Sequence, residues 1–153
     1  MPKSDTRKKC SQRPPKDKGH APSYLILAQQ HHLAGKLSQA ETVYNEILKA
    51  EPNNPDAIHL LGVLCHQAGN VNNAVELILK ALSGHPNFPE AYNNLGNAYI
   101  DLDQFQEAID SYNLALGIRP GYKVARNNLC RPFTNLATTS TNWATLKGPQ
   151  KTT

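Results

Sequence analysis

Six columns of residues in this chain recur with a period of 34. They are Tyr24, Ile58 and Tyr92; Leu27, Leu61 and Leu95; Ala28, Gly62 and Gly96; Ala40, Ala74 and Ala108; Tyr44, Ile78 and Tyr112; and Pro52, Pro86 and Pro120. A fixed period of this length indicates that one supersecondary unit is copied along the chain. Because a single unit cannot bury its own apolar face, neighbouring units must stack to form a continuous core.

Each period contains two helices, as judged from its apolar spacing. In the third unit two stripes of apolar residues advance in steps of three and four, which is typical of the buried side of a helix. The first stripe is Ala91, Tyr92, Leu95, Ala98, Tyr99 and Leu102, and the second is Phe105, Ala108, Ile109, Tyr112, Ala115 and Leu116. The chain is therefore predicted to be all-α, an α-solenoid of antiparallel helix pairs.

Residues that suit helix ends stand between these stripes. Pro55 and Pro89 are predicted in the first turn of a helix, where a missing amide hydrogen has no helical partner to lose. Gly35 and Gly69 are predicted to end the first helix of their pairs in a left-handed conformation. Asp103 has the equivalent place in the third unit, and aspartate tolerates that conformation better than most residues.

Small residues predict that the two helices of a pair approach closely. They are Ala28, Gly62 and Gly96 in the first helices, and Ala40, Ala74 and Ala108 in the second. A leucine in place of Ala108 should overpack this contact and cost about 1–3 kcal/mol. The large side chains of Tyr92, Tyr99 and Tyr112 are expected to fill the space between neighbouring pairs.

The pattern resembles the tetratricopeptide repeat. The third unit matches it at Tyr92, Leu95, Gly96, Tyr99, Ala108, Tyr112, Ala115 and Pro120. The second unit departs from it at Ile58, Cys65 and Ile78, and the first at Ala28, His31 and Ile47. The resemblance covers about residues 21–130 and implies a right-handed superhelix. Within the family, the chain is also similar to the arrays that precede O-linked N-acetylglucosamine transferase-like or sulfotransferase-like domains.

The period divides the chain into an array and two tails. The array is predicted over residues 21–131, with units at 21–54, 55–88 and 89–122 and a partial fourth unit at 123–131. Residues 1–20 are predicted to be a basic, disordered tail, because they combine dense charge with no apolar periodicity. Residues 132–153 are predicted to be a Thr-rich, disordered tail, because Pro132 should end or kink the last helix.

The charge is distributed unevenly. Residues 1–20 carry seven Lys or Arg against two Asp, whereas residues 21–130 carry six against ten Asp or Glu. The array itself is thus acidic, and we do not expect a nucleic-acid partner for it, although the run "RKK" at 7–9 leaves open a nucleic-acid binder that acts through its tails. The sequence has neither an apolar signal region nor a membrane-spanning run, so we expect a cytoplasmic protein.

The resemblance implies that the first helix of each unit lines a concave groove that binds peptides. The candidate groove residues are Gln29, His59, Val63, His66, Asn93, Asn94, Asn97, Asn127 and Asn128. Among them, Asn94 and Asn128 match the asparagine ladder of the N-acetylglucosamine transferase arrays, whose amides clamp a peptide backbone. An amide both donates and accepts, so it can pair with any main chain. The alternative is that asparagine is simply common at such surface positions.

The resemblance also implies a test for a second binding mode, the carboxylate clamp that captures the C-termini of chaperones. That mode needs Lys or Arg at defined groove positions, which here hold Leu25, Leu60, Glu90 and Asn94. An anionic tail would find no charge partner there. We therefore do not expect chaperone-tail capture.

No catalytic motif, phosphate-binding loop or cofactor motif is recognisable. His32, His59 and His66 suggest a metal site, but no Cys or carboxylate completes a tight ligand spacing, so no metal is expected. Cys65 and Cys130 fall in core columns, and an odd number of three Cys without a CxxC pair argues against a disulfide framework.

These features predict a non-enzymatic scaffold or adaptor that binds a protein or peptide partner. The alternative is the regulatory array of a glycosyltransferase-like or sulfotransferase-like enzyme that lacks its catalytic domain. Because the fourth unit breaks off, we expect a truncated or alternatively terminated form of a longer array. The incompletely capped last repeat also suggests a route to oligomers.

Overall fold

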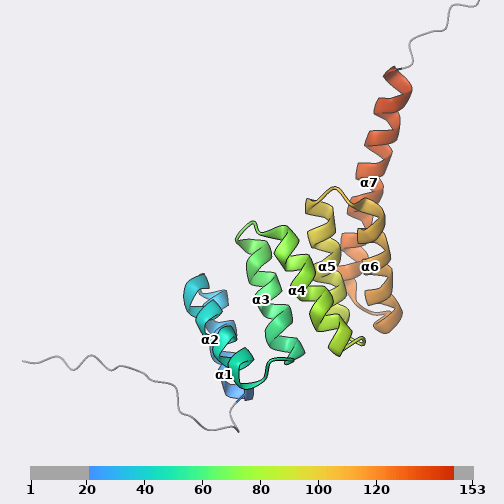
Figure 1. Cartoon of the computed structure of the whole chain (residues 1–153). Helices are drawn as coiled ribbons and strands as arrows, with labels where there is room; N and C mark the ends of the chain where they lie inside the picture. The colour runs from blue at the N-terminus through green and yellow to red at the C-terminus, as the bar shows by residue number, and fades with distance from the viewer. Residues whose placement is uncertain (1–20, 147–153) are drawn as a thin grey trace, which may run out of the picture.

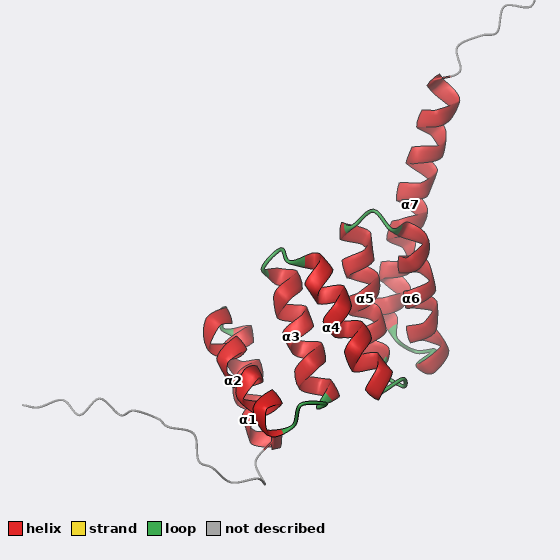
Figure 2. Cartoon of the chain, viewed as in Figure 1, coloured by secondary structure: helices red, strands yellow, loops and turns green. Residues whose placement is uncertain are grey.

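The computed structural model describes the backbone of residues 21–146 and the side chains of residues 23–134. Within that range all regular elements are helices, and no strand is present (Figure 2). They are α1 (Ala21–Leu33), α2 (Leu37–Ala50), α3 (Pro55–Gln67), α4 (Val71–Gly84), α5 (Pro89–Asp101), α6 (Phe105–Ile118) and α7 (Lys123–Leu146). The expectations for residues 1–20 and 147–153 lie outside the described residues.

The helices stack in pairs along one direction (Figure 1). Contacts are densest within the pairs α1 with α2, α3 with α4, and α5 with α6, and each second helix also packs on the first helix of the next pair. The predicted all-α solenoid of helix pairs is therefore confirmed.

The turns within the pairs form where the sequence predicts them. Gly35, Gly69 and Asp103 have φ angles of 72°, 84° and 58°, the left-handed region that lets a helix end and the chain reverse. Pro55 and Pro89 are the first residues of α3 and α5, as expected.

The small-residue columns allow the close approach of the paired helices. Ala28, Ala40, Ala74 and Ala108 are fully buried. A Cβ placed on Gly96 would lie 2.6 Å from Cε1 of Tyr112, and one on Gly62 would lie 2.9 Å from Cγ1 of Ile78. Tyr112 thus fills the space within its own pair, where its ring lies over Gly96, and it also belongs to an apolar cluster with Leu129 of the next unit.

The expected helix end at Pro132 is wrong, since α7 continues through this residue to Leu146 and projects beyond the stack (Figure 1). Proline removes one helical hydrogen bond, but the side chain of Pro132 is fully buried, and burial of apolar surface stabilises the helix at this point. Residue 137 stands one period after Asp103 and is an alanine. Alanine disfavours the left-handed conformation, so the turn that ends the other first helices does not form.

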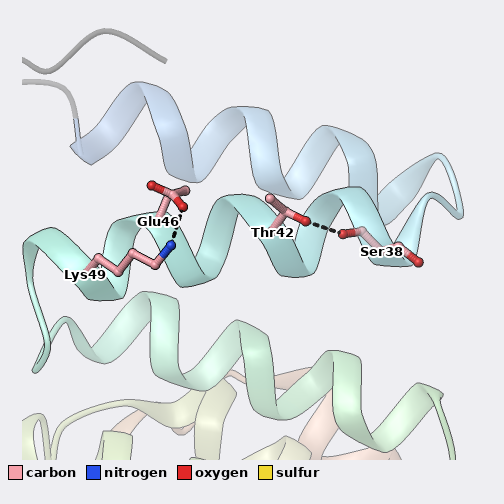
Figure 3. A network of polar contacts seen from close by, with 4 residues as sticks. All are labelled: Ser38, Thr42, Glu46 and Lys49. Carbon is pink, nitrogen blue, oxygen red and sulfur yellow. Dashed lines mark hydrogen bonds and ion pairs between the residues drawn. The ribbon is translucent and has the colours of Figure 1, made fainter. Parts of the chain in front are cut away.

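The outer face of α2 is polar. Thr42 Oγ1 donates to the carbonyl oxygen of Ser38 over 2.8 Å, and Lys49 Nζ lies 2.6 Å from Glu46 Oε1 (Figure 3). These exposed contacts lie on the side of α2 that no neighbouring helix covers, and each contributes little to stability. Over residues 21–146 no helix combines the length and hydropathy needed to cross a bilayer.

Candidate interaction surface on the first helices

The first helices of successive units lie side by side. Direct contacts join α1 to α3, α3 to α5, and α5 to α7. We call the side of these four helices that carries their fifth, sixth, ninth, twelfth and thirteenth residues the first-helix face, counting from residues 21, 55, 89 and 123. All nine predicted groove residues occupy these positions.

Polar side chains bridge the neighbouring first helices across a constant sequence distance. His59 Nε2 lies 2.9 Å from Asn94 Nδ2, and Asn128 Nδ2 donates to Asn93 Oδ1 over 3.0 Å. His32 Nε2 lies 2.7 Å from Gln67 Oε1, and His66 Nε2 lies 2.7 Å from Asp101 Oδ2. Each pair is separated by 35 residues, one period plus one. Successive first helices are therefore offset by one residue.

These bridges fall in two rows. One row joins the fifth residue of a unit to the sixth of the next, as in His59 to Asn94 and Asn93 to Asn128. At the first junction the same two places hold Leu25 and Leu60, which both pack against the first apolar cluster. The other row joins the twelfth residue to the thirteenth, as in His32 to Gln67 and His66 to Asp101.

His59 is buried, with 4% of its surface exposed, and its ring makes an edge contact with Phe88 at a centroid distance of 4.6 Å. Burial lowers its pKa to about 4, although the carboxylates of Asp56 and Glu90 oppose the shift. The imidazole is therefore neutral at pH 7, and Nε2 accepts the hydrogen bond from Nδ2 of Asn94. His59 is thus part of the contact between α3 and α5.

The structure divides the predicted groove residues by accessibility. His59 and Asn93 are each 4% exposed, because they lie in the contacts between neighbouring first helices. They therefore have little surface for a ligand. Val63, His66, Asn94, Asn97 and Asn128 are half-buried, and Gln29 and Asn127 are exposed. The accessible amides thus concentrate on α5 and α7, with Gln29 alone on α1.

Tyr112 holds the side chain of Asn97 in place. The Tyr112 hydroxyl donates to Asn97 Oδ1 over 2.8 Å, and burial raises the pKa of the phenol to about 12. The phenol therefore stays protonated as a donor. The bond uses the oxygen of the amide and orients its Nδ2 group. Asn128 is engaged in the opposite sense, because its Nδ2 group donates to Asn93.

Together, the first helices α1, α3 and α5 carry acidic but no Lys or Arg side chains. The carboxylates are those of Asp56, Glu90 and Asp101. Two of these are paired, Asp101 with His66 and Glu90 with Arg119, whose NH1 lies 2.6 Å from Glu90 Oε1. The part of the face formed by α1, α3 and α5 therefore has no fixed cation for an anionic ligand.

The histidines named above contact different neighbours rather than one another. Among the residues whose side chains are described, no group of three His, Cys, Asp or Glu is placed to hold a metal ion. A shallow hollow lies elsewhere, lined by Asp110, Asn113, Leu114, Gly117 and Ile118. Since one helix, α6, supplies all five residues, the hollow is an open surface feature.

The 35-residue bridges were not anticipated from the sequence. The signal was present, because polar residues pair at this offset at His59 and Asn94, Asn93 and Asn128, and His66 and Asp101. A search confined to the 34-residue period places these partners in different columns. The spacing of 35 rather than 34 residues depends on how far each first helix is shifted along the next one. That shift is set by the packing of neighbouring units, not by the local sequence.

Comparisons with known proteins agree with this architecture. Residues 31–93 and residues 89–122 match the tetratricopeptide repeat family. No curated protein matches the sequence. An O-GlcNAc transferase mutant of Thermobaculum terrenum is a structural neighbour with 28% identity and a TM-score of 0.73, over 78% of this chain and 23% of the other. The chain thus spans about a quarter of that transferase's length.

Two further structures are similar. MamA has 28% identity and a TM-score of 0.65, over 76% of this chain and 63% of its own. The first such domain of Spaghetti (RPAP3), solved with the HSP90 peptide SRMEEVD, has 22% identity and a TM-score of 0.73. That match covers 79% of this chain and 96% of the other. At that identity the likeness concerns the fold.

Proposed function

Because the chain belongs to the tetratricopeptide repeat family, we propose that it is a protein-interaction module that binds a partner's peptide segment along the first-helix face. In this role it acts as a scaffold or adaptor without chemistry of its own. The peptide-bound RPAP3 neighbour supports a peptide as the ligand class.

The observation that carries the proposal is the row of accessible amides on the neighbouring helices α5 and α7. Asn97 presents Nδ2, because Oδ1 accepts from Tyr112, and Asn128 presents Oδ1, because Nδ2 donates to Asn93. One side chain thus offers a donor and the other an acceptor, which is what an extended peptide backbone requires. Asn127, which is exposed on α7, adds a third amide.

The ligand differs in charge from the acidic peptide SRMEEVD of the RPAP3 structure. Since α1, α3 and α5 contain no Lys or Arg, an acidic segment has no cation to pair with over most of the face. We therefore propose a neutral or weakly basic extended segment, held mainly through its main chain.

A peptide display library tests the proposal, with selected binders measured by fluorescence anisotropy. Asn97→Ala and Asn127→Ala should each weaken binding by about tenfold or less, as expected for one or two lost hydrogen bonds. Tyr112→Phe removes the bond that orients Asn97 yet keeps the amide, so it should weaken binding less than Asn97→Ala does. N-methylation of the peptide main chain should abolish binding. Peptides that bind equally well after all these changes would refute the proposal.

A second candidate function is supported by the transferase neighbour, whose array is 28% identical to this chain. In that case the module recruits partners for a glycosyltransferase-like catalytic domain in a longer protein. An antibody against residues 89–122 applied to native extracts separates the two cases. A species well above 16.8 kDa that carries transferase activity supports the second candidate.

A further inference from the structure

The outward stripe of α7 is exposed where the equivalent stripes of the other first helices are covered. The eighth residues of the first three units, Ala28, Gly62 and Gly96, are all buried. The eighth residue of the fourth unit, Cys130, is exposed. We call Lys123, Arg126, Cys130 and Phe133, which follow one another in steps of three and four along α7, the open stripe.

The eleventh and fourth residues of the units show the same difference. Phe133 is 54% exposed, whereas its counterparts His31, Cys65 and Tyr99 are half-buried. Arg126 is exposed, whereas its counterparts Tyr24, Ile58 and Tyr92 are buried or half-buried. The open stripe therefore lacks the cover that each earlier unit has.

The earlier pairs show what that cover is. The second helix of each pair places a large side chain over the small eighth residue, as Ile78 does over Gly62 and Tyr112 over Gly96. No described residue does this for Cys130, because α7 runs on to Leu146 without turning back. The shape that fits the open stripe is therefore an antiparallel helix with an aromatic or aliphatic residue facing Cys130.

The positive charge of the open stripe indicates what charge a helix that covers it should carry. In the third pair Arg119, at the end of the second helix, reaches Glu90 near the start of α5. The start of α7 instead carries Lys123 and Arg126, and α7 has no Asp or Glu at all. A covering helix needs a carboxylate near its C-terminal end, where α6 is followed by Arg119. A second α7 from another copy would bring like charges together.

We propose that the open stripe of α7 is a docking site for an amphipathic helix of a partner protein, antiparallel to α7 and acidic at its C-terminal end. The partner helix completes the fourth unit by laying its apolar side on Cys130 and Phe133. This site is separate from the first-helix face and takes a helical rather than an extended ligand.

A peptide taken from this chain is the probe. Residues 104–119 with Arg119→Glu contain the apolar stripe of α6 and place a carboxylate beside Lys123. Titration into the full chain, followed by amide NMR, should shift the resonances of residues 123–134. The same peptide with Arg119 retained should bind about twofold to fivefold more weakly, the range expected for one exposed ion pair.

Two variants of the full chain locate the contact. Phe133→Asp should lower the affinity for the probe by at least about tenfold, because it places a charge in the apolar contact. Leu79→Asp is the matched control, since Leu79 is similarly exposed but lies on α4, and it should leave the affinity unchanged. Circular dichroism should show that both variants stay folded.

Three outcomes overturn the proposal. The first is the absence of binding at millimolar peptide. The second is a set of shifted resonances around Gln29, Val63 and Asn97, which would put the probe on the first-helix face. The third is a concentration-dependent dimer that Phe133→Asp dissociates, which would make a second copy of this chain the occupant.

Discussion

His59 Nε2 lies 2.9 Å from Asn94 Nδ2, and Leu25 and Leu60 hold the equivalent places at the preceding junction. A polar pair and an apolar pair thus occupy the same position in one solenoid. Either pair is compatible with a buried contact. The polar pair is stable there because its donor has an acceptor, and the apolar residues because they have no polar group that needs one.

This equivalence predicts the result of a double-mutant cycle. His59→Leu or Asn94→Leu alone should lower the free energy of unfolding by about 1–3 kcal/mol. The first leaves Nδ2 of Asn94 without its acceptor, and the second leaves Nε2 of His59 and Nδ2 of Asn93 without their partner. The double variant should recover part of that loss, since it recreates the pair of the first junction but leaves Nδ2 of Asn93 without Oδ1 of Asn94. Urea denaturation of the four proteins measures the coupling. Additive losses would show that the two junctions are not interchangeable.

The buried imidazole also predicts a pH dependence. The pKa of His59 is about 4 in the folded chain and 6.5 in the unfolded chain, so the unfolded chain binds more protons between these values. The stabilisation is complete above pH 6.5 and is lost as the pH falls toward 4, by up to about 3 kcal/mol. The double variant that carries His59→Leu and Asn94→Leu should lose less stability over this window. Equal losses in both proteins would contradict the assignment.

Two helical glycines predict opposite responses to a methyl group. Gly96→Ala should cost about 1–3 kcal/mol, because the new Cβ would lie 2.6 Å from Cε1 of Tyr112. Gly117→Ala meets no atom within 4 Å and should raise stability by up to about 1 kcal/mol through helix propensity. Thermal unfolding of both variants is the measurement. A Gly96→Ala protein as stable as the parent would mean that Tyr112 moves aside freely.

The turn glycines predict a cost of backbone conformation alone. Gly69 has a φ of 84° and nothing within 4 Å of an added Cβ. Gly69→Ala should therefore lower stability by about 1–2 kcal/mol through the left-handed conformation only. Gly84→Ala is the control, because that site is equally open but has no left-handed backbone. If both variants unfold alike, strain at residue 69 is not what the alanine changes.

Much of this architecture can be predicted from short stretches of the sequence. Pro55 and Pro89 mark helix starts, Gly35, Gly69 and Asp103 mark turns, and the 34-residue period marks the pairs. These features depend on a few neighbouring residues, so a single sequence suffices. The burial of His59 and Asn93 depends instead on how two helices from different units slide against each other. The peptide-binding role of the accessible amides stays a prediction.

The C-terminal end of α7 shows that a single residue type, here proline, is not enough to predict where a helix ends. Pro132 favours a helix end, yet its side chain is fully buried and α7 continues through it. Ala137, five positions later, favours the continuous helix, because alanine disfavours the left-handed turn that Asp103 makes.

The three described helix pairs reverse at a residue in the left-handed conformation, whereas α7 continues as one helix. The helix that fails to reverse, α7, extends about 17 Å past the thirteenth residue of its unit, at about 1.5 Å per residue. A chromophore joined at Leu146 would stand at that distance from the end of the stack, on a stiff arm. Energy transfer from such a label to one on α1 would then report the length of the whole array.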